Sequence, residues 1–70
     1  MKNKYAIHIF WSDEDEGFIA VCREFPGLSA FGETREEALA EAQAALDAMI
    51  KTYQDGGIPL PEPDSLLAAA

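Results

Sequence analysis

The sequence predicts an α+β domain, with an antiparallel three-stranded sheet followed by one long helix packed on one face. Two stretches before residue 24 alternate apolar and other residues, which is the period of a strand. The pair Pro26-Gly27 separates them from a third, short apolar stretch. From residue 35 the apolar residues recur at spacings of three and four, which is typical of an amphipathic helix. Seventy residues suffice for one domain, residues 1–70.

The first two strands are expected at residues 4–11 and 18–23. The second has apolar residues on both faces, so we expect it to be central and covered on both sides. A polar, acidic loop over residues 12–17 joins the two strands, with Gly17 turning the chain back. The link to the third strand is also short, which favours a meander. The core face of the first strand consists of Tyr5, Ile7, Ile9 and Trp11.

The stretch around the third strand carries most of the local signals. Pro26-Gly27 predicts a turn, because Pro presets φ and Gly permits a positive φ. The strand is expected at residues 28–32, and Gly32 frees the backbone at its end. Thr34 and Glu37 then form a capping box. In it the Thr34 hydroxyl accepts from the amide of residue 37, and the Glu37 carboxylate accepts from the amide of residue 34.

The helix is expected over residues 35–54, ending at Gly56 in a left-handed conformation. Residues 58–70 form a Pro-rich tail, which should run extended because its prolines lack amide donors. A short fourth strand in this tail is an alternative that Pro59, Pro61 and Pro63 weaken. The helix stripe that should face the sheet consists of Ala38, Leu39, Ala42, Ala45, Leu46, Met49, Ile50 and Tyr53.

Charge and composition exclude several classes of function. Five basic against 13 acidic residues give a formal charge of −8, which argues against direct nucleic-acid binding and against an anionic membrane surface. One cysteine permits no intrachain disulfide and fits a reducing, cytoplasmic location, and no signal peptide or membrane span is evident. So small a core gains from added burial, so a homo-oligomer is expected.

No residue pattern predicts catalysis, a metal or a cofactor. His8 is the single histidine and has no ligand partner at a suitable spacing, and Cys22 has no catalytic neighbour. The acidic loop lacks the spacing of a calcium site. We therefore expect no enzyme activity, no metal and no cofactor.

The residues Phe25, Pro26, Gly27, Gly32, Thr34, Glu36, Glu37 and Ala38 carry a family resemblance. In this order and spacing they resemble the N-terminal domain of HicB-type antitoxins, over about residues 5–63. The resemblance implies a partial ribonuclease H-like fold. Because the strand interiors carry no carboxylate to hold catalytic metal ions, the scaffold is expected to be degenerate and non-catalytic.

The resemblance also implies a function: binding and neutralising a small basic toxin that cleaves messenger RNA through a histidine. Family members often carry a C-terminal DNA-binding segment. The chain lacks a basic, helix-forming extension before Ala70, so autoregulation by this chain is in doubt. The alternative is an orphan oligomeric scaffold or small-ligand binding protein with no toxin. The candidate partner-binding residues are Phe10, Glu24 and Glu33.

Overall fold

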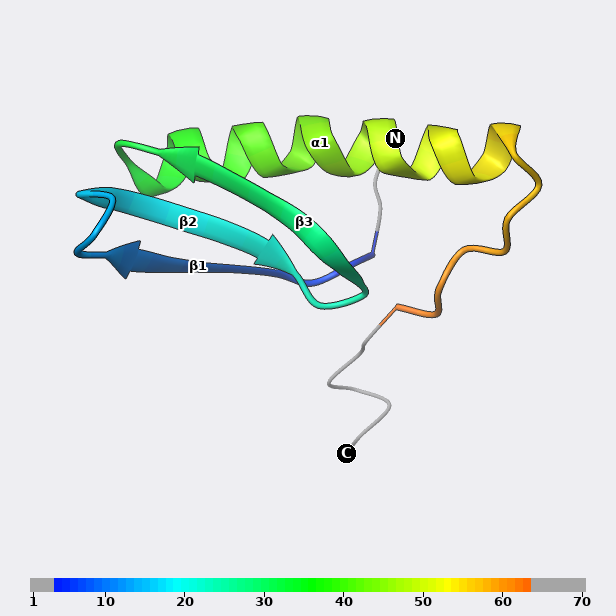
Figure 1. Cartoon of the computed structure of the whole chain (residues 1–70), viewed down its shortest axis with the longest axis horizontal. Helices are drawn as coiled ribbons and strands as arrows, with labels where there is room; N and C mark the ends of the chain where they lie inside the picture. Colours follow the sequence, from blue (N-terminus) through cyan, green and yellow to red (C-terminus); the bar gives the residue numbers. More distant parts are fainter. Residues whose placement is uncertain (1–3, 64–70) are drawn as a thin grey trace.

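The computed structural model describes residues 4–63. It contains three strands, β1 (Ile7–Ser12), β2 (Gly17–Cys22) and β3 (Phe25–Gly32), and one helix, α1 (Arg35–Asp55). The strands form an antiparallel sheet in the order β1-β2-β3, and α1 lies across one face of it (Figure 1). The predicted α+β fold class is therefore confirmed, with β2 in the centre of the sheet.

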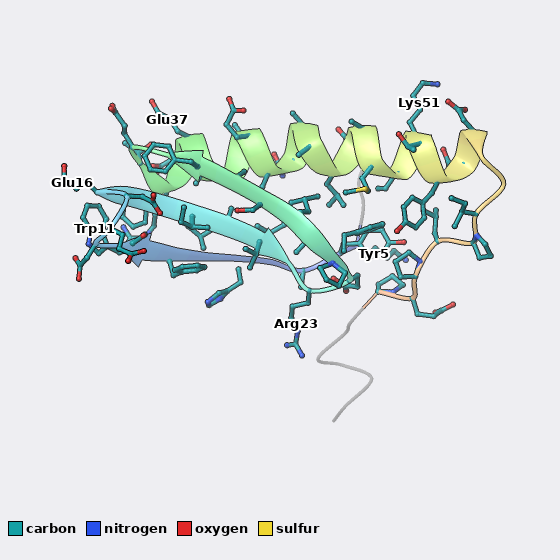
Figure 2. All side chains as sticks on the ribbon, viewed as in Figure 1. Tyr5, Trp11, Glu16, Arg23, Glu37 and Lys51 are labelled. Atoms are coloured by element: carbon teal, nitrogen blue, oxygen red, sulfur yellow. The ribbon has the colours of Figure 1, made fainter. Side chains whose placement is uncertain are left out.

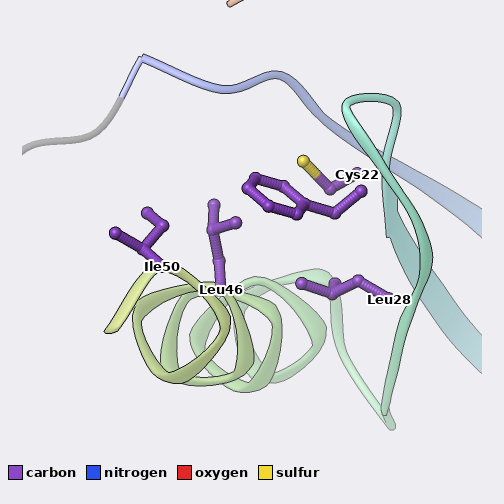
Figure 3. Close-up of a cluster of buried hydrophobic side chains, with 5 residues drawn as sticks. Cys22, Leu28, Leu46 and Ile50 are labelled. Atoms are coloured by element: carbon purple, nitrogen blue, oxygen red, sulfur yellow. The ribbon is translucent and has the colours of Figure 1, made fainter. Parts of the chain in front are cut away.

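The larger part of the core lies between the sheet and the second half of α1. Cys22 and Leu28 point from the sheet towards Leu46 and Ile50 of the helix (Figure 3). Phe25 completes this cluster and is only 2% exposed. Its ring meets the rings of Tyr5 and Tyr53 edge to face, at centroid distances of 5.0 and 5.2 Å. Such pairs add to the burial energy of the rings themselves.

Small residues let the first half of α1 approach the sheet closely. Ala38 and Ala42 pack against Ala20 at the centre of β2, and all three are completely buried. A Cβ atom on Gly32 would collide with the amide of Ala38 and lie 2.7 Å from the carbonyl carbon of Glu37. Gly32 therefore does more than free the strand end. It makes room for the backbone of the helix.

The helix begins with a cap that differs in one half from the expected box. The Thr34 hydroxyl accepts from the Glu37 amide at 3.1 Å, as expected. The Glu37 carboxylate instead accepts from the amide of Glu33, one residue earlier than Thr34, at 2.8 Å. Both bonds satisfy amides that lack intrahelical partners.

Gly56 is the C-cap, as predicted, but the left-handed conformation predicted for it is wrong, because the left-handed residue is Gly57. Gly57 has φ 70°, whereas Gly56 continues the right-handed helix at φ −88°. The Gly57 amide donates to the Gln54 carbonyl at 3.2 Å, and the Ile58 amide donates to the Tyr53 carbonyl at 2.8 Å. These two bonds define a Schellman motif, in which the left-handed residue is the one after the cap.

The turn between β2 and β3 lies at residues 23–24, so the turn predicted at Pro26-Gly27 was wrong. β3 already begins at Phe25, which pairs with Cys22. The next pair, Val21 with Ser29, shows that the register shifts and leaves Pro26-Gly27 in an irregular part of the strand. Because β3 is an edge strand, it tolerates a proline that cannot donate to a neighbour. Gly27 has no positive φ.

The first residues of the tail return towards the start of the chain. The Tyr5 hydroxyl donates to the Pro61 carbonyl at 2.7 Å, while Ile58 and Leu60 remain 50% and 37% exposed. No strand forms within residues 58–63, and the rest of the predicted tail lies outside the described residues. The predicted helix stripe faces the sheet with one exception, since Leu39 is 36% exposed.

Candidate protein-interaction surfaces

The face of the sheet turned away from α1 is largely apolar, and each of the three strands contributes an apolar residue to it. The cross-strand register places Phe10, Ile19 and Phe31 in one row. His8, Val21 and Ser29 form a second row beside it. These six positions alternate with those that contact the helix, so they share the opposite side. We call this surface the open face.

Two aromatic rings stand out on the open face. Phe10 is 40% exposed and stacks on His8 at a centroid distance of 5.4 Å. Phe31 is 45% exposed, and its ring occupies the place of a Cβ atom on Gly17. A side chain at position 17 would therefore displace this ring. The left-handed residue of the turn is Glu16, with φ 53°, and Gly17, which was expected to turn the chain back, already begins β2.

Carboxylates gather at the end of the molecule where α1 begins. The hairpin loop holds Asp13, Glu14, Asp15 and Glu16, and the β3–α1 turn brings Glu33 and the exposed acids of the first helical turn near it. Phe18, which follows the loop, pairs with Gly32. Figure 2 shows Glu16 and Glu37 at this end and Lys51 near the other. We call this region the acidic end.

An exposed tryptophan lies beside the acidic end. Trp11 is 52% exposed, and its ring meets Phe18 edge to face at 5.3 Å. Its indole nitrogen donates to Asp13 at 2.7 Å, which fixes the ring. The Arg35 guanidinium lies 4.7 Å from the centroid of the Phe18 ring. Trp11 was expected in the core, but α1 does not cover it.

The three candidate partner-binding residues do not form one cluster. Phe10 lies within the open face, and Glu33 lies exposed in the β3–α1 turn. Glu24 lies in the β2–β3 turn, at the opposite end of β3 from Glu33. It is half-buried and accepts a hydrogen bond from the Cys22 thiol at 3.5 Å. Glu24 is therefore partly committed to the interior of its own chain.

The pKa of two groups near Glu24 is raised. Burial raises the pKa of the Cys22 thiol above 9.0, and the nearby Glu24 carboxylate adds to the effect. Desolvation is also the main cause that raises the pKa of Tyr5 above 10.0, followed by the charges of Glu24 and Glu62. A thiol held in its protonated form is a poor nucleophile.

The described part of the chain shows neither a metal cluster nor a membrane helix. Within residues 4–63, no three His, Cys, Asp or Glu side chains are arranged to hold a metal ion. The helix found there is not apolar enough to cross a membrane.

The sequence interpretation missed Phe31 as a member of the open face. Strict alternation from Phe25 would place Phe31 on the same face as Phe25. The register shift at Pro26-Gly27 interrupts this alternation, so Phe31 lies on the open face instead. Alternation within the predicted strand 28–32 could have found it, because Phe31 lies on the opposite face from Leu28 and Ala30.

Over residues 4–63, the structure is a small α+β domain in which a helix covers one face of the sheet and leaves the other face open. The family model for the HicB-like antitoxins of bacterial toxin–antitoxin systems matches residues 4–69. The chain therefore belongs to the HicB-like antitoxin family. Comparison with curated proteins and with solved structures gave no match.

Proposed function

We propose that this chain is the antitoxin of a toxin–antitoxin pair, and that it binds and masks a small basic toxin that cleaves messenger RNA. Family membership over residues 4–69 is the observation that carries this proposal. The formal charge of −8 supports a basic partner, since opposite charges speed association and favour the correct orientation. Because such a toxin acts on messenger RNA, this chain would bind it in the cytoplasm.

We place the toxin contact at the acidic end. Glu33 and the neighbouring Glu36 are exposed there, so they can pair with lysines or arginines without first breaking a buried contact. Glu24, whose carboxylate accepts from Cys22, is a weaker candidate. In this role the protein is not an enzyme: it occludes the toxin, and its degenerate ribonuclease H-like scaffold needs no metal.

Growth rescue tests the proposal. Expression of a small basic protein encoded beside this chain should arrest growth, and co-expression of this chain should restore it. The two proteins should also co-purify. The proposal fails if no neighbouring basic protein is toxic or if co-expression leaves the arrest unchanged.

Charge reversal tests the site. Glu33→Lys with Glu36→Lys should weaken toxin binding, and the effect should shrink at high salt because surface charges are screened. The matched control is Asp47→Lys with Glu62→Lys, two exposed acids away from this end, which changes the net charge equally and should bind as the wild type does. Equal binding by both variants would mean that the toxin binds at another surface of the chain.

A second candidate function is an oligomeric scaffold with no toxin, which the open face favours. Apolar patches this continuous on a small domain commonly mark an interface. A chain that associates with itself but rescues no toxin would support this candidate over the antitoxin.

A further inference from the structure

Trp11 presents an aromatic ring to solvent in a fixed orientation. The side chain is 52% exposed, the largest exposed fraction among the large apolar residues of the described chain. Its indole nitrogen donates to Asp13 Oδ1 at 2.7 Å, and its ring meets Phe18 edge to face at 5.3 Å. These two contacts restrict the torsions of the side chain, so a partner that covers the ring has little side-chain entropy to overcome.

The acidic hairpin loop beside Trp11 is held by its own hydrogen bonds. The Ser12 hydroxyl donates to Asp15 Oδ2 at 2.9 Å, and the Asp15 amide donates to the same hydroxyl at 3.3 Å. Asp13 and Glu16 are exposed in this loop, and Figure 2 shows Trp11 and Glu16 at the same end of the molecule. A partner that covers the ring therefore also meets carboxylates.

We infer that Trp11 and Asp13 anchor an arginine side chain of a basic protein partner. The face of an aromatic ring attracts a cation within about 6 Å of its centroid, and tryptophan does so most strongly. Only Oδ1 of Asp13 accepts from the indole, so Oδ2 can accept from the same guanidinium. Arginine fits this pair better than lysine, because its planar group stacks on an aromatic face while its N–H groups reach a carboxylate.

The surroundings of two adjacent exposed rings show why the ligand is a cation. Phe10 is 40% exposed, but it lies on the open face, and none of the three strands contains Asp or Glu. Trp11 instead lies against the acidic loop. An apolar partner there would desolvate carboxylates without pairing them, which costs free energy. The same end already contains one contact of this kind, since the Arg35 guanidinium lies 4.7 Å from the centroid of the Phe18 ring.

The identity of the partner as a toxin rests on the proposed function, whereas the arginine site itself does not. Trp11 pairs with Phe18, which pairs with Gly32, so the ring lies at the end of the sheet from which Glu33 follows. It would add an aromatic anchor to the charged contacts that we place there. Tryptophan and arginine are the residue types that most often dominate the binding energy of protein interfaces.

The experiment titrates the full chain with an arginine hexapeptide and, separately, a lysine hexapeptide at physiological ionic strength. Trp11 is the single tryptophan, so its fluorescence reports on this site directly. The arginine peptide should change the fluorescence at lower concentration than the lysine peptide does. By calorimetry, Trp11→Leu should bind the arginine peptide about threefold more weakly than the wild type. The matched control is Phe10→Leu, which should bind as the wild type does.

A second pair of variants separates the local carboxylate from the net charge. Asp13→Asn keeps an acceptor for the indole but removes the charge, so it should weaken binding of the arginine peptide. Asp47→Asn removes the same charge from an exposed position on α1 and should change the affinity less. This pair also carries the test if circular dichroism shows that Trp11→Leu does not fold.

Two results would overturn the inference: equal affinities of Trp11→Leu and Phe10→Leu, or no preference of the wild type for arginine over lysine. Equal affinities of Asp13→Asn and Asp47→Asn would exclude Asp13 from the site. Failure of the proposed function has a different signature. The chain would then bind the arginine peptide through Trp11 and yet rescue growth from no neighbouring basic protein.

Discussion

The Cα of Gly32 faces the amide nitrogen of Ala38 so closely that no side chain fits between them. Strand β3 and the first turn of α1 are thereby held backbone to backbone. This contact explains why the core at this end consists of Ala20, Ala38 and Ala42 and still excludes water. It also explains why α1 starts directly after β3 with only a two-residue link.

Gly32→Ala should destabilise the domain by about 2 kcal/mol, because backbone atoms of Glu37 and Ala38 must move to admit the methyl group. For a domain of this size the midpoint of thermal unfolding should fall by roughly 10 °C. The control is Gly27→Ala. A Cβ there meets nothing within 4 Å and the residue has no positive φ, so its midpoint should stay near that of the wild type. Equal midpoints for both variants would contradict the close approach.

Thr34→Ala should cost about 1 kcal/mol, since it removes the acceptor for the Glu37 amide at the helix start. Thr52→Ala is the matched control. The Thr52 hydroxyl donates to the Ala48 carbonyl within the helix, a bond that contributes little, and alanine is the better helix former. Urea titration of both variants should show a lower midpoint for Thr34→Ala alone. A loss of similar size in Thr52→Ala would mean that the Thr34 cap contributes no more to stability than a side-chain hydrogen bond within the helix.

Stability should fall at alkaline pH through the buried thiol of Cys22. Burial raises its pKa in the folded chain above 9.0, so the folded state holds this proton more tightly than the unfolded state does. The stabilisation is therefore complete below about pH 9 and is lost as the pH rises through the folded value. Thermal midpoints between about pH 7 and about pH 11 should decline less steeply for Cys22→Ala than for the wild type. Parallel declines would exclude the thiol as a cause.

The fold class could be predicted because its signals are periodic and local. Alternation placed Ile7 and Ile9 on one face, and the spacing of Ala38, Ala42, Leu46 and Ile50 placed one helix face on the sheet. The cap at Thr34 could be predicted for the same reason, since the Thr34 hydroxyl and the Glu37 amide that donates to it are three residues apart. Such features need no knowledge of which strands are neighbours.

The errors arose where distant segments decide the local structure. Pro26-Gly27 has the composition of a turn, but the pairing of Phe25 with Cys22 draws the chain into an edge strand that tolerates proline. Gly17 has the composition of a turn residue, but it begins β2 and lies beside the ring of Phe31, fourteen residues later in the sequence, which a Cβ at Gly17 would displace. Glu24 stays a candidate partner-binding residue, but its hydrogen bond to the Cys22 thiol depends on the turn at residues 23–24, which the sequence did not predict.

The helix end offers a test of the corrected cap, because the two adjacent glycines should respond in opposite ways. Gly57 has φ 70°, a conformation that costs an alanine roughly 1 kcal/mol, although a Cβ there would meet no atom within 4 Å. Gly56 is right-handed, and its Cβ would lie 3.6 Å from the Ile58 side chain and 3.4 Å from the Thr52 carbonyl oxygen. Gly56→Ala should therefore be neutral or raise stability by about 0.5 kcal/mol through the unfolded chain.

Thermal unfolding of both alanine variants beside the wild type measures this difference. We expect the midpoint of Gly57→Ala to fall by several degrees, roughly 4–8 °C for each kcal/mol lost in a domain of this size. Gly57→Asn is a further control, because asparagine tolerates the left-handed region better than alanine does and should recover part of the loss. If Gly56→Ala proved the more damaging substitution, the left-handed residue would be Gly56, and the Schellman bonds from Gly57 and Ile58 to Gln54 and Tyr53 would not describe this helix end.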